Sequence, residues 1–313
     1  MKREIGWDNI THDDRSVVTV GTFDGVHRGH QAIIEYLNRR AKEQSGPSTL
    51  VSFDPHPRAV VHGDDVPLLT TVAERADLLE DLGLDRLVVV PFSMDFAQLG
   101  PEEYVRDVLV KRIGVQEITV GYDHRFGKDR AGDVDLLREL GGQYGFETDV
   151  IPPQEVDHDV VSSSSIRSLL VEEGAIEPVN ECLGRPYQLD GIVARGEGRG
   201  RKLGYPTANL ALEDARKLVP KRGVYATRVI LPDGRQRGGM MNIGRRPTFD
   251  EMDVTVEVHL LDFEGDLYGE RLSVQFLQRL RDEQKFQSAE ALAAQLSEDE
   301  GRCRTVVGAM ATA

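Results

Sequence analysis

Cysteine is scarce in this chain of 313 residues, which contains only Cys182 and Cys303. Two cysteines so far apart exclude a disulfide framework and a CxxC metal site, and they favour a reducing compartment. No segment approaches the run of about 18 apolar residues that spans a membrane, and the first ten residues lack the apolar core of a secretory signal. We therefore expect a cytoplasmic protein.

Positive charge is also in deficit, because 38 lysines and arginines face 53 acidic residues, for a net charge of −15. A phosphate backbone or an anionic membrane binds clustered positive charge, so we expect neither nucleic acid nor a membrane as a partner. No feature indicates an obligatory protein partner. With 40% hydrophobic residues the chain can form cores. At roughly 100–200 residues per domain, its length predicts about two domains.

The first half of the chain alternates between apolar strands and amphipathic helices. Short apolar runs predict strands at 17–21, 49–53, 86–92, 117–121 and 147–151, and helical spacing predicts helices at 28–43, 72–82, 101–113 and 131–144. This alternation is typical of an α/β fold in which helices cover both faces of a parallel sheet.

The pattern changes near Gly184, which divides the chain into expected domains of residues 1–184 and 185–313. Beyond it, turn dipeptides separate apolar strands, and we expect Asp233–Gly234 and Glu264–Gly265 to form hairpin turns. This pattern predicts that the second half of the chain folds as a small antiparallel barrel or sandwich. It ends in an amphipathic helix at about 288–298.

The strongest local signal is GTFDGVHRGHQ at 21–31, between a predicted strand and a predicted helix. Its glycines allow close approach of a ligand, and the N-terminus of the helix offers unpaired N–H groups to an anion. His27 and His30 share one face of the first helical turn. This arrangement suits a polyphosphate and a phosphoryl-transfer transition state. Surface histidines at a helix start, or zinc with two further ligands, are the alternatives.

Other segments carry weaker signals, each with a plain structural alternative. SFDPHPR (52–58) is a turn restricted by proline, and a serine of SSSSIRSLL (162–170) can cap a helix that leaves Arg167 on its polar face. Asp123 and Arg125 follow a predicted strand, where an ion-paired loop is the alternative. In the second half, GEGRGRKLGYPTANL (196–210) is a basic glycine loop or a solvated hairpin, and Glu257 lies on the polar face of strand DVTVEVHLL.

Taken together, these motifs resemble a known family. GTFDGVHRGH resembles the histidine signature of the nucleotidyltransferase superfamily. SFDPHPR, VGYDHRFGKDRAGD (120–133) and SSSSIRSLL follow in the order found in the bifunctional bacterial riboflavin kinase/FMN adenylyltransferase (FAD synthetase) family, and PTAN resembles its riboflavin kinase signature. The resemblance implies a Rossmann-like nucleotidyltransferase domain at 1–184 and a riboflavin kinase barrel with a terminal helix at 185–313.

For the first half, the resemblance implies that FMN is adenylylated by ATP to FAD and pyrophosphate, with His27 and His30 as catalytic residues. The implied ATP-binding residues are Gly21, Phe23, Asp24, His27, Gly29, His30, Ser164, Ser165 and Arg167. The implied flavin-binding residues are Phe53, Asp54, Pro55, His56, Pro57 and Asp123. Tyr122 and His124 depart from the family pattern, which commonly has an acid and an aromatic residue there.

For the second half, the resemblance implies that riboflavin is phosphorylated by ATP to FMN and ADP, with Glu257 as the general base. The implied ATP-binding residues are Gly198, Arg201, Lys202, Gly204, Thr207 and Asn209, of which Thr207 and Asn209 also ligate Mg²⁺. Arg281 and Phe286 join Glu257 at the flavin. The rival hypotheses are an adenylyltransferase for a pantetheine phosphate, a non-catalytic flavin sensor or carrier, and a nucleic-acid regulator.

Overall fold

The computed structural model describes residues 1–313 except 122–123, 152–160, 197–199, 201–203, 248–251 and 312–313. Contacts within the chain divide it into two units, Met1–Ser163 and Ser164–Ala313. The functional boundary near Gly184 remains a prediction, because the segment from Ser164 to Gly184 groups with the second unit by contact.

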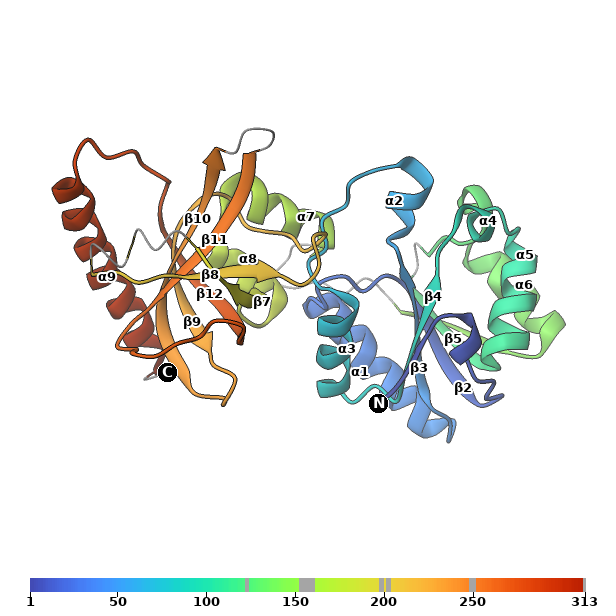
Figure 1. The fold of residues 1–313 in the computed structure, drawn as a ribbon. Helices are drawn as coiled ribbons and strands as arrows, with labels where there is room; N and C mark the ends of the chain where they lie inside the picture. Colours follow the sequence, from blue (N-terminus) through green and yellow to red (C-terminus); the bar gives the residue numbers. More distant parts are fainter. Residues whose placement is uncertain (122–123, 152–160, 197–199, 201–203, 248–251, 312–313) are drawn as a thin grey trace. The chain divides into compact units, whose positions relative to one another are not determined.

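The first unit contains a parallel sheet of six strands in the order β1-β4-β3-β2-β5-β6 (Figure 1). Every neighbouring pair is parallel, which confirms the α/β prediction. The sequence did not indicate β1, a strand of four residues at the edge whose only buried side chain is Glu4. The strands are β1 (Lys2–Ile5), β2 (Ser16–Val20), β3 (Ser48–Asp54), β4 (Arg86–Pro91), β5 (Val115–Gly121) and β6 (Glu147–Ile151).

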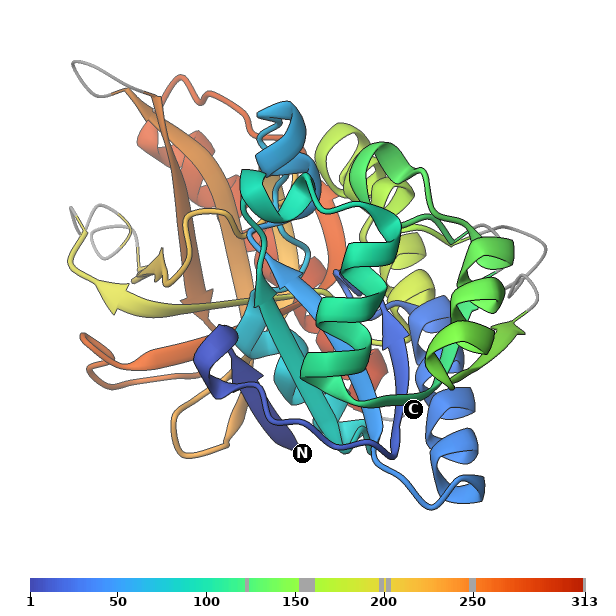
Figure 2. The same ribbon diagram turned by 90° about the vertical axis from the view of Figure 1, so that its right-hand side faces the viewer.

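Helices cover both faces of this sheet, as predicted. On one face, α1 (Arg28–Glu43) and α3 (Val72–Asp81) bury Leu37 and Leu79 against the strands. On the other face lie α5 (Pro101–Tyr104), its wider π-helical continuation η2 (Val105–Ile113) and α6 (Val134–Tyr144). Figure 2 views the sheet from this second face. The short elements are η1 (Trp7–Asn9), α2 (Pro57–His62), α4 (Met94–Ala97) and η3 (Lys128–Arg130).

The strand order reverses beside β2. The chain adds β3 and β4 on one side of β2 and then crosses to place β5 on its other side. The loops that follow β2 and β5 therefore diverge, and such a switch point opens a crevice at the carboxyl ends of the strands.

The second unit is a closed antiparallel barrel in the order β10-β11-β8-β7-β12-β9, which confirms the barrel prediction (Figure 1). Asp233–Gly234 forms the predicted turn between β9 and β10, and Gly234 supplies a φ of 81° there. The strands are β7 (Gln188–Ala194), β8 (Ala208–Leu212), β9 (Gly223–Ile230), β10 (Gln236–Pro247), β11 (Met252–Leu260) and β12 (Arg271–Arg281).

The second predicted hairpin, at Glu264–Gly265, is wrong. Strand β11 pairs with β10 and β8, whereas β12 pairs with β7 and β9. The segment 261–270 therefore crosses to another part of the barrel instead of joining two neighbouring strands. A turn dipeptide between apolar strands does not determine which strands pair when the barrel closes.

Helices complete the second unit, and the last of them extends far beyond the predicted 298. Its buried Cys303 packs with Val224, Met240 and Leu280 of the barrel. Asp299, with no exposed side-chain surface, accepts hydrogen bonds from the Arg281 guanidinium at 2.7–3.1 Å. The helices are α7 (Ser163–Ser168), η4 (Leu169–Glu173), α8 (Ile176–Leu183) and α9 (Ala289–Ala311).

We predict that Asp299→Asn destabilises the barrel by about 3 kcal/mol, because it leaves the largely buried charge of Arg281 without its carboxylate. Calorimetric unfolding measures the effect. The exposed neighbour Glu298 provides the control, since Glu298→Gln removes an acid from the same helix turn without touching the pair. Equal effects of the two substitutions would contradict this role for Asp299.

Candidate active sites

The predicted histidine pair lies at the start of α1. His27 is the N-cap of this helix, is 5% exposed, and accepts a hydrogen bond on Nδ1 from the His30 backbone N–H at 3.3 Å. The two imidazole rings stack with their centroids 3.6 Å apart, and Phe23 stacks on His30 at 4.4 Å. A Cβ on Gly29 would lie 3.2 Å from Nδ1 of His27, so glycine suits this close approach.

Asp24 fixes the turn that carries these histidines. Its buried carboxylate accepts hydrogen bonds from the Leu69 N–H at 3.0 Å, the Thr70 N–H at 2.8 Å and the Thr70 hydroxyl at 3.0 Å. The Gly25 N–H donates to the same hydroxyl at 2.9 Å. Asp24 therefore ties the turn to the segment before α3, and its contact with ATP remains a prediction.

The surroundings of His30 favour a neutral imidazole. Its Nδ1 is buried, and within the described chain it has no hydrogen-bond partner. Burial lowers the pKa of His30 well below its ordinary value of 6.5, and the nearby His27 and Arg75 lower it further. A neutral ring still carries one N–H donor, so His30 can donate to a phosphate oxygen without carrying a charge itself.

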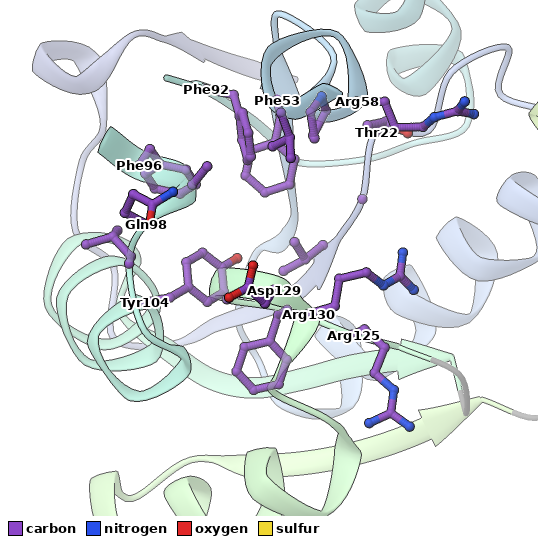
Figure 3. A pocket seen from close by; sticks show the side chains of 18 of the residues that line it. Thr22, Phe53, Arg58, Phe92, Phe96, Gln98, Tyr104, Arg125, Asp129 and Arg130 are labelled. Atoms are coloured by element: carbon purple, nitrogen blue, oxygen red, sulfur yellow. The ribbon is translucent and has the colours of Figure 1, made fainter. Parts of the chain in front are cut away.

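A pocket of about 710 Å³ opens at the switch point of the sheet (Figure 3). Gly21 and Thr22 follow β2 and begin the turn of residues 21–27 that leads to the histidine pair, here called the histidine turn. Both residues form part of the pocket wall. Aromatic rings form much of the remaining wall, with neighbouring centroids 5.4–6.0 Å apart. Such walls suit a flat heteroaromatic ligand. The rings belong to Phe53, Phe92, Phe96, Tyr104 and Phe126.

Basic side chains also line this pocket, at Arg58, Arg125 and Arg130 (Figure 3). Two of them are ion-paired, Arg58 with Asp64 at 3.1 Å and Arg125 with Asp133 at 3.0 Å. The pocket therefore combines an aromatic interior with local positive charge in an acidic chain, a combination that suits an aromatic ligand with an anionic group.

Of the predicted flavin residues, Phe53 and Pro57 line the pocket. Asp54, Pro55 and His56 do not line it, and His56 instead caps α2 by accepting the Arg58 N–H on Nδ1 at 3.2 Å. Asp123 and Tyr122 lie outside the described residues. Four further aromatic rings of the pocket were not predicted, because they come from separate segments that share no motif; they are Phe92, Phe96, Tyr104 and Phe126.

The serine segment begins beside the same turn. The Ser163 hydroxyl donates to the Asp24 carbonyl at 2.8 Å, a contact that the motif itself does not indicate. The predicted ATP ligands that follow it belong to the second unit. Ser164 and Ser165 are exposed and Arg167 is half-buried, while Ile166 supplies the expected buried face of α7. Their contacts with ATP remain a prediction.

In the barrel, three predicted residues lie together. The Thr207 hydroxyl donates to Glu257 Oε2 at 3.1 Å. Asn209 on β8 lies directly opposite Glu257 on β11. Asn242 on β10 lies opposite Glu257 on the other side of β11, and no sequence motif indicated it. A Cβ on Gly196 would lie 2.1 Å from the Asn209 amide nitrogen, so a larger residue there would displace the Asn209 side chain.

The face of β11 follows the predicted alternation. Val256, Val258 and Leu260 are buried, and Glu257 on the other face is half-buried. Val254 is the exception, because it is 51% exposed near the start of the strand.

The remaining predicted kinase residues are placed only in part. Gly204 adopts a φ of 84°, while Gly198, Arg201 and Lys202 lie outside the described residues. Arg281 lies 5.7 Å from the ring centre of Phe286. Because Arg281 also binds Asp299, its described contacts anchor α9, and its contact with a flavin remains a prediction. A cavity of about 80 Å³ beside Thr207 is lined by Leu260, Phe263, Leu267 and Tyr268, among others.

The donor atoms of the barrel site fit a hard cation. Thr207, Asn209 and Glu257 offer hydroxyl, amide and carboxylate oxygens, which Mg²⁺ prefers. In the described part of the chain, no three His, Cys, Asp or Glu residues cluster in a way that could hold a metal. The described residues therefore offer no further ligands that would support a zinc ion at the histidine pair. Among the described helices, none is both long and apolar enough to cross a membrane.

Two family models match the chain, FAD synthetase over residues 9–165 and riboflavin kinase over residues 183–307. Curated relatives called bifunctional riboflavin kinase/FMN adenylyltransferase match almost the whole chain. That of Pseudomonas fluorescens is 40% identical over 303 residues, 96% of either chain. That of Escherichia coli K12 is 37% identical over 313 residues, 98% of either chain.

A solved structure has the same fold over nearly the full length. It is described as a macrolide-efflux protein from Streptococcus pneumoniae, with 32% sequence identity and a TM-score of 0.88. The match covers 97% of this chain and 99% of that one. Both units of this chain therefore have counterparts in one solved polypeptide.

We predict that the stability of the first unit falls as the pH is lowered through about 6.5, because the unfolded chain then binds a proton that folded His30 resists. Thermal unfolding between about pH 5 and 7.5 measures this slope. His30→Gln should flatten it, whereas His12→Gln, at an exposed position, should preserve it. A wild-type slope in the His30→Gln protein would rule out the buried neutral imidazole.

Proposed function

We propose residue roles for a chain that belongs to the family of bifunctional riboflavin kinase/FMN adenylyltransferases. The two reactions of this family are the phosphorylation of riboflavin to FMN, by the riboflavin kinase domain, and the adenylylation of FMN to FAD, by the FAD synthetase domain. We assign them to residues 185–313 and 1–184. Membership of this family disfavours a pantetheine phosphate acceptor, a non-catalytic flavin carrier and a nucleic-acid regulator.

The aromatic pocket beside the histidine turn is the observation that carries the proposal for the first half. The flavin ring of FMN binds among the aromatic side chains, and its phosphate approaches Thr22 at the end of β2. An oxygen of that phosphate attacks the α-phosphorus of ATP, and pyrophosphate leaves. His27 and His30 donate N–H groups to the phosphoryl oxygens as charge develops. The reaction needs no covalent enzyme intermediate.

The surrounding residues hold ATP for this attack. Gly21, Phe23 and Asp24 belong to the turn that presents the N-terminus of α1 to the phosphates, and Gly29 lies in the first turn of that helix, where free N–H groups favour anions. Ser164, Ser165 and Arg167 bind ATP phosphate oxygens, for which a guanidinium has matching geometry. Asp54, Pro55 and His56 connect the pocket-lining Phe53 and Pro57 without lining the pocket themselves, and in this proposal they shape the flavin side of the site together with Asp123.

In the second half, Glu257 accepts the proton of the riboflavin 5′-hydroxyl while that oxygen attacks the γ-phosphorus of ATP, and ADP leaves. Thr207 and Asn209 hold the divalent ion that ATP-dependent enzymes of this kind typically need, and we propose Mg²⁺. When bound, the ion neutralises phosphate charge. Gly198, Arg201, Lys202 and Gly204 contact ATP, and Arg281 and Phe286 contact the flavin.

The cysteines and the net charge of the chain favour a location and a set of partners. Cys182 and Cys303 are present as thiols, which a reducing cytoplasm preserves. The net charge of −15 disfavours nucleic acid and anionic membranes as partners. The proposed ligands are the substrates and products of the two reactions: riboflavin, FMN, FAD, ATP, ADP and pyrophosphate. No obligatory protein partner is proposed.

The direct test is to incubate the purified chain with riboflavin, ATP and Mg²⁺ and to separate the flavins over time. We expect FMN first and FAD after it. FMN alone would contradict the adenylylation assigned to the first half, and bound but unchanged riboflavin would contradict the assignment as an enzyme. Chelation of the metal should stop the reaction, and added Mg²⁺ should restore it.

We predict that His30→Ala slows FAD formation from FMN about 100-fold or more, because a donor to the transition state is lost. Formation of FMN from riboflavin should be unchanged, since Glu257 and Thr207 belong to the other unit. His12→Ala, on the exposed N-terminal segment, is the matched control. Loss of both activities in the His30→Ala protein would contradict separate sites.

We predict the reverse pattern for Glu257→Gln. Removal of the base should slow phosphorylation of riboflavin about 100-fold or more, while supplied FMN is still converted to FAD. Steady-state rates for the two steps, measured separately, decide the outcome. Glu298→Gln, on the exposed side of α9, controls for loss of one negative charge. Near-normal phosphorylation by Glu257→Gln would exclude Glu257 as the base.

A further inference from the structure

Arg75 is a buried cation that the reaction described above does not use. It lies on α3 and is 3% exposed. Its Nη1 donates to the Thr22 carbonyl at 2.5 Å and to the Ser52 hydroxyl at 2.8 Å. The Ser52 hydroxyl in turn donates to the Thr22 carbonyl at 3.1 Å. One carbonyl of the histidine turn is thus held from both α3 and β3.

The turn that receives these bonds has an unfavourable backbone. Phe23, Gly25 and Val26 have φ values of 49°, 86° and 41°. For non-glycine residues such conformations cost about 1–2 kcal/mol each, so bonds to the rest of the fold must hold them. Thr22 directly precedes Phe23, whose ring stacks on His30. A shift of the Thr22 carbonyl would therefore move the Phe23 ring, which packs against the imidazole of His30.

Arg75 also acts on His30 through its charge. His27 from the same turn and Arg75 from α3 are the two groups whose charge lowers the pKa of His30, in addition to burial. The guanidinium stays protonated throughout the working pH range. It therefore contributes positive charge behind the phosphate-binding turn while it helps to keep the imidazole neutral.

We propose that Arg75 is a positioning residue for adenylyl transfer, which holds the Thr22 carbonyl and thereby sets the placement of the histidine pair. It adds a fixed positive charge behind the site and does not touch the substrates. This inference rests on the function proposed for the first half. Thr22 lines the pocket (Figure 3), so the anchored carbonyl group belongs to a residue of the site wall.

The test uses the full chain with three variants. Arg75→Gln removes the charge, and Arg75→Lys keeps the charge but loses the planar guanidinium. Arg86→Lys is the matched control, because Arg86 is an equally buried arginine, 3% exposed, that binds Glu4 at 2.7 Å at the start of β4. For each variant, kcat and KM for FAD formation, riboflavin phosphorylation and thermal unfolding are measured. Histidine NMR signals, with His30 assigned by His30→Gln, report its titration.

We expect Arg75→Gln to lower kcat for FAD formation about 10- to 100-fold, as misplacement of a reacting group does, with little change in KM for ATP. The titration midpoint of His30 should rise, since a neighbouring positive charge is gone. Arg75→Lys should keep the His30 titration and still lower kcat. Riboflavin phosphorylation should be unchanged in all variants.

A kcat for Arg75→Gln within about twofold of wild type would overturn the proposal, since misplaced groups cost far more. The proposal would also be overturned if Arg86→Lys and Arg75→Lys lost equal stability and equal kcat. The loss of kcat would then reflect general destabilisation. If Arg75→Gln does not fold, the comparison of Arg75→Lys with Arg86→Lys decides. If the wild type forms no FAD, the proposed function fails, while the His30 titration still tests the charge effect of Arg75.

Discussion

The first site depends on the buried carboxylate of Asp24. A buried carboxylate is costly unless donors surround it, and the Thr70 and Leu69 N–H groups and the Thr70 hydroxyl meet that requirement. They join the strained turn after β2 to the start of α3. With the turn fixed, α1 begins at Arg28 with His27 as its cap. The anion-binding end of a helix and the open switch point of the sheet then lie next to each other.

The second site depends on strand register. Glu257 lies opposite Asn209 and Asn242 because β11 pairs with β8 on one side and with β10 on the other. A slip of one residue would turn Glu257 into the barrel and Val258 out of it. Glu257, Asn209 and Asn242 all lie within the second unit, whereas the histidine pair and the aromatic pocket lie within the first. The turn before α1 in one unit and the closed barrel in the other thus position the residues of the two proposed sites.

Sequence patterns predicted what is local in the chain. Apolar periodicity indicated the parallel sheet and the barrel, and short motifs placed His27 with His30 and Thr207 near Asn209. What depends on distant segments was missed. The aromatic wall of the pocket collects five single rings from separate segments, and Arg75 belongs to no motif that the sequence offers. The wrong hairpin at Glu264–Gly265 reflects strand pairing that only barrel closure decides. The terminal helix was predicted to end at about 298, but it continues to Ala311.

If each reaction runs at its own site, two inactive proteins should complement each other. His30→Ala retains the kinase site and Glu257→Gln retains the adenylylation site, so neither protein alone should convert riboflavin to FAD at an appreciable rate. Mixed in equal amounts with ATP and Mg²⁺, they should form FAD after a lag in which free FMN accumulates. Failure of the mixture to form FAD, while wild-type protein does so under the same conditions, would contradict two independent sites.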